Sequence, residues 1–106
     1  MGECYILEGK EVVKADLMTW AKWLQDAGDK RIVKQEDVSG KHVSTVFLGL
    51  DHSFGGESPM LFETIVFPSK DNLDEEICER CSTWEQAEEQ HKRIVGEVAN
   101  GSQEET

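Results

Sequence analysis

The chain has 106 residues, of which 22 are acidic and 11 are basic, so its formal net charge at pH 7 is −11. This length fits one domain whose modest hydrophobic core needs neither disulfide bonds nor a structural metal ion. A strong negative charge repels nucleic acids and anionic membrane surfaces, and it attracts basic protein surfaces. The composition therefore argues against direct binding to nucleic acid or to a membrane.

The sequence also indicates where the protein works. No apolar run approaches the roughly 18 residues that a membrane-spanning helix requires. The first five residues, MGECY, lack the basic-then-apolar order of a signal peptide. The chain has three cysteines, and an odd number argues against a secreted disulfide framework. We therefore expect a cytoplasmic protein.

The first elements of the chain are predicted from short local signals. The apolar residues 4–7 indicate a strand, and Gly9 with Lys10 indicates a turn. Apolar residues at helical spacing, which include Leu17 and Trp20, then predict a helix over residues 16–27. Asp16 is placed as its N-cap and Gly28 as its stop.

The middle of the chain predicts antiparallel strands. Residues 32–38 form one expected strand, which ends at a turn at residues 39–40. Two apolar runs, 43–50 and 60–67, are expected to pair, with the first as a central strand because both of its faces are apolar. Glu63 interrupts the apolar row of the second run, so it requires a partner, an exposed edge or a function.

The last element is predicted to be a helix over residues 82–98, after a short edge strand near residues 77–78. Ser82 and Glu85 fit a capping box, and Glu89 and Arg93 have the spacing of an i,i+4 ion pair. His91 lies on the apolar face, where we expect a half-buried packing residue. The expected architecture is one α+β domain over residues 1–98, an antiparallel sheet of three to five strands with two helices packed on it, followed by a flexible tail over 99–106.

Two groups of residues have the composition of a chemical site. Cys78 and Cys81 have the C-x-x-C spacing of half a zinc site or a redox pair, but no other cysteine or histidine completes a standard spacing. The simpler interpretation is a pair of reduced thiols, one of them packed in the core. The second group could form an acid–base set or a small-ligand pocket near the loop between the two long runs, and it comprises Asp51, His52, Glu57 and Glu63. No nucleophile accompanies this group, so we expect no catalytic residues, no cofactor and no enzymatic activity.

The charge excess is concentrated late in the chain. Residues 1–56 contain 9 acidic and 7 basic residues, whereas residues 57–106 contain 13 acidic and 4 basic residues. Such an excess often serves only solubility. A dense row of carboxylates can also imitate the phosphates of a nucleic acid to a protein that binds phosphates with Arg and Lys. The predicted partner-binding residues are Asp71, Asp74, Glu75, Glu76, Glu79, Glu85, Glu88 and Glu89.

Several stretches together form a pattern, and they are residues 43–52, with the sequence VSTVFLGLDH, Gly55-Gly56 with Pro59, residues 61–64 with Phe67, and residues 82–85 (STWE) with Ala87 and His91. This pattern resembles a family of short proteins encoded by bacteriophages and prophages. The resemblance covers most of the chain, but Cys78 and Cys81 lie outside its pattern. It implies a phage product that acts in the bacterial cytoplasm, and it implies no particular chemistry.

The expected function is therefore binding and inhibition of a basic host or defence protein, by analogy with small acidic phage inhibitors such as anti-CRISPR proteins. The partner could be a nuclease complex that binds nucleic acid, which the acidic surface would imitate. One alternative is a ligand-binding or hydrolytic pocket around Asp51, His52, Glu57 and Glu63. Another is a structural or assembly protein that works as an oligomer, for which a homodimer is the simplest form.

Overall fold

The computed structural model of the chain describes residues 3–50, 59–69 and 77–104. Its elements are β1 (Cys4–Glu8), β2 (Glu11–Ala15), α1 (Leu17–Ala27), the short 3-10 helix η1 (Gly28–Arg31), β3 (Ile32–Val38), β4 (Lys41–Phe47), β5 (Phe62–Phe67), β6 (Ile77–Cys81) and α2 (Trp84–Glu104). β1 and β2 form a two-stranded sheet, and β3 to β6 form a four-stranded sheet in chain order. Every strand pair is antiparallel. The predicted α+β fold is confirmed.

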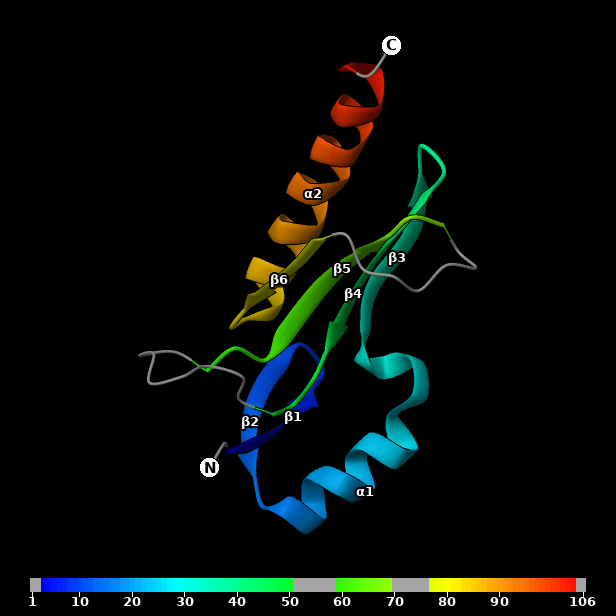
Figure 1. The fold of residues 1–106 in the computed structure, drawn as a ribbon. Helices are drawn as coiled ribbons and strands as arrows, with labels where there is room; N and C mark the ends of the chain where they lie inside the picture. Colours follow the sequence, from blue (N-terminus) through cyan, green and yellow to red (C-terminus); the bar gives the residue numbers. More distant parts are fainter. Residues whose placement is uncertain (1–2, 51–58, 70–76, 105–106) are drawn as a thin grey trace.

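The two sheets with their helices form two units, which share one apolar cluster. α2 lies along one face of the four-stranded sheet and contacts all four strands, whereas α1 packs against β1 at the other end of the molecule (Figure 1). The two units meet where the chain leaves β4. There the backbone amide of Tyr5 donates a hydrogen bond to the carbonyl of Gly49 at 2.7 Å, and Cys4 pairs with Leu50.

Local signals define the ends of α1 as the sequence predicts. The Asp16 carboxylate accepts a hydrogen bond from the backbone amide of Thr19 at 2.7 Å, which satisfies one of the free amides of the first turn. Gly28 follows the helix with a φ of 52°, a conformation that favours glycine. Trp23 of α1 then reaches the four-stranded sheet, where its ring meets that of Phe47 edge-on at 5.5 Å. This aromatic contact anchors α1 to the larger sheet.

Two local features shape the four-stranded sheet. One is the tight turn between β3 and β4, and the other is the alternation of side chains between the two faces of the sheet. Ser39 and Gly40 both have positive φ values, 52° and 83°, which is typical of the two-residue turns that match the twist of paired strands. β4 pairs with β3 and β5, so its predicted central position is confirmed. Alternate side chains of β4 and β5 face α2 and are fully buried, and they are Val43, Thr45, Phe47, Phe62, Thr64 and Val66.

The structure corrects several predicted boundaries. β2 was not predicted, and β6 extends to Cys81 rather than ending near residue 78. α2 begins at Trp84 and continues past Val98 to Glu104. Its capping box lies one residue later than predicted: the Thr83 hydroxyl accepts from the Gln86 amide at 3.1 Å, and the Gln86 side chain accepts from the Thr83 amide at 3.2 Å.

In the part of the chain that the structure describes, buried apolar side chains form two clusters. The larger cluster joins β1, β4, β5 and α2 around Phe47 and Phe62. The smaller cluster lies farther along α2, around Val43, Val66 and Ile94. Among residues 3–50, 59–69 and 77–104, no helix is long and apolar enough to cross a membrane.

Candidate functional site

The predicted acidic surface is partly within the described residues. Asp71, Asp74, Glu75 and Glu76 lie outside them. Glu85, Glu88 and Glu89 are exposed on the first two turns of α2. Carboxylates near a helix N-terminus are favoured by the helix dipole, so this end of α2 accommodates negative charge well. We call these three residues the α2 carboxylate face.

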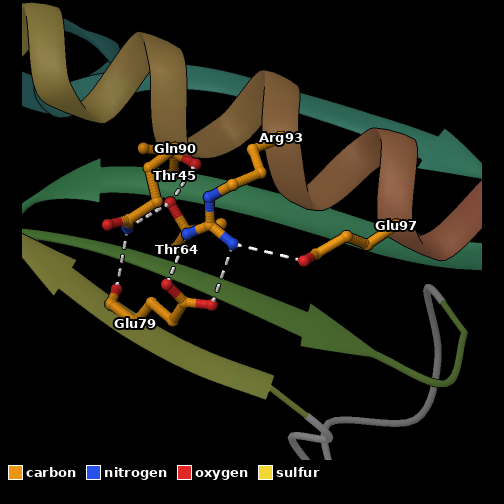
Figure 2. A network of polar contacts seen from close by, with 6 residues as sticks. All are labelled: Thr45, Thr64, Glu79, Gln90, Arg93 and Glu97. Carbon is orange, nitrogen blue, oxygen red and sulfur yellow. Dashed lines mark hydrogen bonds and ion pairs between the residues drawn. The ribbon is translucent and has the colours of Figure 1, made fainter.

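Arg93 does not neutralise this face. Its guanidinium instead bridges Glu79 on β6 and Glu97 one turn further along α2 (Figure 2). The predicted pair of Glu89 with Arg93 is thus replaced by one ion pair with β6 and one further along α2. Glu79, a predicted partner-binding residue, is engaged in an ion pair within the protein.

Other basic side chains are also engaged by acids of the same chain. Lys14 lies 2.8 Å from Glu3, and Arg80 lies 2.9 Å from Glu63. Within the described ranges, none of the ion pairs includes a member of the α2 carboxylate face. The excess negative charge is therefore presented outward at the start of α2.

Beneath α2 lies a buried polar layer that separates the two apolar clusters. The hydroxyls of Thr45 and Thr64 are 2.7 Å apart on neighbouring strands. Thr45 also contacts Nδ1 of His91 at 2.7 Å, and Gln90 donates from Nε2 to Thr64 at 2.9 Å. The Gln90 amide also donates to the carbonyl of Glu79 at 3.0 Å (Figure 2). His91 is 2% exposed and both threonines are fully buried, so these groups satisfy one another rather than water.

The contact between His91 and Glu36 determines which group donates in each hydrogen bond of this layer. Nε2 of His91 lies 3.1 Å from the Glu36 carboxylate, which as an anion only accepts, so this nitrogen carries the proton. Nδ1 is then the acceptor in a neutral ring, and Thr45 donates to it. Thr64 in turn donates to Thr45, and Gln90 donates to Thr64. One directed chain therefore satisfies every member without a charge on His91.

Acid should weaken this arrangement. Burial is the largest influence on His91 and lowers its pKa below the ordinary 6.5, and the hydrogen bond to Glu36 opposes this only in part. The unfolded chain therefore takes up the proton at higher pH than the native protein does, so stability falls as the pH drops below about 6.5. Urea unfolding at about pH 7.5 and about pH 5.5 measures the loss of unfolding free energy between the two pH values. This loss should be smaller in His91→Gln than in the wild type. An unchanged loss in His91→Gln would contradict the assignment.

The second predicted site is not assembled by the described residues. Asp51, His52 and Glu57 lie outside them. Glu63 lies on the sheet face opposite α2, where its carboxylate accepts a hydrogen bond from Nε of Arg80 at 3.0 Å. Its side chain is 13% exposed, so the interruption of the apolar row is explained by an ion pair with the adjacent strand.

The C-x-x-C spacing does not bring the two thiols of Cys78 and Cys81 together. Both cysteines lie on β6, where residues three positions apart point to opposite faces of the sheet. Cys78 is paired with Ile65 on the open face, and Cys81 with Phe62 on the α2 face. Burial raises the pKa of Cys81 to about 11, which keeps it protonated near neutral pH. Within residues 3–50, 59–69 and 77–104, no three potential metal ligands come together.

The sequence did not reveal the members of the polar layer besides His91. Thr45 and Thr64 look like ordinary β-branched strand residues, and Glu36 is 55 positions away from His91. The sequence did contain a signal for the two threonines. In the alternating pattern of its strand, each of them occupies a buried position where an apolar residue is expected. His91 was predicted to be half-buried, and the structure shows it buried and hydrogen-bonded at both ring nitrogens.

The chain matches no protein-family model, no curated protein and no solved structure.

Proposed function

We propose that the protein is a small, non-enzymatic binding protein that uses its acidic C-terminal half to engage and inhibit a basic partner protein. The observation that carries the proposal is the α2 carboxylate face. Its three exposed acids take part in no ion pair within the described part of the chain, whereas Arg80 and Arg93 are held by internal acids. A surface of this kind attracts Arg-rich and Lys-rich proteins and speeds their association.

The sequence resemblance to phage and prophage proteins supports a more specific partner. A phage product benefits from blocking a host or defence protein, and many such proteins bind nucleic acid through basic channels. The row of carboxylates would occupy such a channel in place of phosphates, as in an anti-CRISPR-like inhibitor. The acidic residues 71, 74, 75 and 76 precede β6 in the chain and are proposed as part of the same surface.

Binding to protamine, an arginine-rich protein that packs DNA, tests the proposal. The triple variant Glu85→Gln, Glu88→Gln, Glu89→Gln should bind protamine about ten-fold or more weakly at near-physiological salt. Its matched control is Glu8→Gln, Glu11→Gln, Asp26→Asn, which removes the same charge from exposed positions in the N-terminal half. The control should lose no more than about three-fold.

The wild-type affinity should also fall steeply with rising salt, and the protein should compete with duplex DNA for protamine. Equal losses in the two triple variants would show that only net charge matters, and would overturn a localised binding face. Binding that does not respond to salt would overturn the mimicry of nucleic acid.

A further inference from the structure

A cavity of about 310 Å³ opens between the edge strand β3 and α2, beside the α2 carboxylate face. Its size lies at the lower end of the range for small-ligand pockets. β3 and α2 both contribute to its walls, which are lined by Val33, Lys34, Glu36, Glu88, His91, Lys92 and Val95.

A bulge in β3 contributes to the wall of the cavity. The pairing of β3 with β4 shifts register between Ile32 and Lys34, so the extra residue Val33 forms a bulge. Val33 and its neighbour Lys34 consequently both line the side of the strand that faces α2. On α2 the lining residues have the i, i+3, i+4, i+7 spacing of a single helix face.

The carboxylate of Glu36 is held in place within this cavity. His91 donates to one of its oxygens, and His91 is itself fixed by Thr45. The Glu36 side chain nevertheless remains 34% exposed. A carboxylate that is positioned beforehand and partly removed from water binds a cation more strongly than a mobile surface acid does.

Three other lining residues suit a long side chain with a cationic end. Val33 and Val95 offer apolar walls for an aliphatic stem, and Glu88 supplies a second carboxylate from the opposite element. A guanidinium has five donors in one plane and can bind carboxylates from two directions, which an ammonium does less well.

Two lysines also line the cavity, and one of them shows how a cation is accommodated. Nζ of Lys34 lies 3.8 Å from the second oxygen of Glu36, and the Lys34 side chain is 62% exposed. Such an exposed pair contributes little to stability, so an incoming cation can displace the lysine at small cost. Lys92 is exposed on the same helix face, where it is free to turn its flexible side chain toward water.

We propose that this cavity receives an arginine side chain of the basic partner, with the guanidinium between Glu36 and Glu88 and the stem between Val33 and Val95. The inference rests on the proposed function and adds an anchor point to it. Electrostatic attraction by the α2 carboxylate face would bring the partner close, and the cavity would select arginine.

The test uses a small probe rather than a protein. N-acetyl-arginine N-methylamide is titrated into the isotopically labelled protein, and amide shifts are followed by NMR. Saturable shifts are expected for amides of β3 and of α2 around His91. The citrulline analogue has the same shape without the charge, and its binding should be about ten-fold or more weaker.

Variants locate the binding. Glu36→Gln retains an acceptor for His91 and should weaken the arginine probe about ten-fold, as should Glu88→Gln, which lies on the exposed side of α2 and keeps the fold intact. Glu85→Gln removes the same charge outside the cavity and should change binding less than about two-fold. Equal binding of the two probes, shifts spread along α2, or no saturable shift would overturn the cavity proposal. Protamine binding that persists in that case leaves the proposed function standing, whereas loss of both overturns both.

Discussion

Gly49→Ala is expected to lower the free energy of unfolding by roughly 2–4 kcal/mol, because it combines backbone strain with a steric clash. Gly49 has a φ of 77°, in the left-handed region that favours glycine. An added Cβ would meet the indole of Trp20 and lie 2.7 Å from the carbonyl oxygen of Tyr5. The Tyr5 carbonyl belongs to β1, so the clash would separate the β1–β2 hairpin from the end of β4.

Gly40→Ala is the matched control for this substitution. Gly40 has a similar φ of 83°, but an added Cβ meets no atom within 4 Å. Gly40→Ala should therefore lower the free energy of unfolding through backbone strain alone, by about 1 kcal/mol. Urea unfolding of both variants, followed by tryptophan fluorescence, measures the difference. If Gly49→Ala costs no more than Gly40→Ala, the close approach of Trp20 and Tyr5 to Gly49 is not rigid.

Thr45→Val should cost roughly 2–4 kcal/mol although valine has nearly the same shape as threonine. The substitution removes the donor to Nδ1 of His91 and the acceptor for the Thr64 hydroxyl. Both groups are buried, so water does not replace the lost partner, and each unpaired group costs about 1–3 kcal/mol. The added methyl group offsets only part of this loss.

Two controls separate the hydrogen bonds from other effects. Ser44→Ala removes a hydroxyl from the next position of β4, where it accepts an exposed hydrogen bond from Gln35 at 2.9 Å, and should cost less than about 1 kcal/mol. Thr45→Ser retains the hydroxyl and loses one methyl group, so it should cost about 1 kcal/mol. A Thr45→Val protein as stable as Thr45→Ser would show that the directed chain contributes little. Nitrogen chemical shifts of His91 report the tautomer independently.

Features governed by neighbouring residues could be predicted from the sequence. Asp16 and Gly28 define α1, and the turn at residues 39–40 defines the first hairpin of the larger sheet. The capping box of α2 was misplaced because two overlapping frames fit the same S/T-x-x-E/Q pattern. Packing of Trp84 and Ala87 against the sheet selects the later frame, and this packing is not a local property.

Features that depend on strand register could not be predicted in the same way. Glu63 was recognised as requiring a partner, but Arg80 becomes that partner only once β5 and β6 are aligned. The pairing of Thr45 with Thr64 and the position of Glu36 beside His91 also depend on alignment between distant segments. The spacing of Cys78 and Cys81 suggested a shared site, whereas extended backbone places their side chains on opposite faces. The side chains of a short motif can thus act together only if its secondary structure points them to the same side.

The polar layer also fixes where α2 sits on the sheet. A helix with a uniformly apolar face can slide along a sheet by one turn, about 5.4 Å, and still bury a similar area. Such a slide here would separate Gln90 from Thr64 and His91 from Thr45, and would leave buried polar atoms unpaired. Thr45 and Thr64 therefore fix the position of α2 along the sheet, in the way that one buried polar residue selects the register of a coiled coil. The spacing between Glu88 on the helix and Glu36 on the strand follows from that alignment, so a pair of internal hydroxyls sets the geometry of charges that face the solvent.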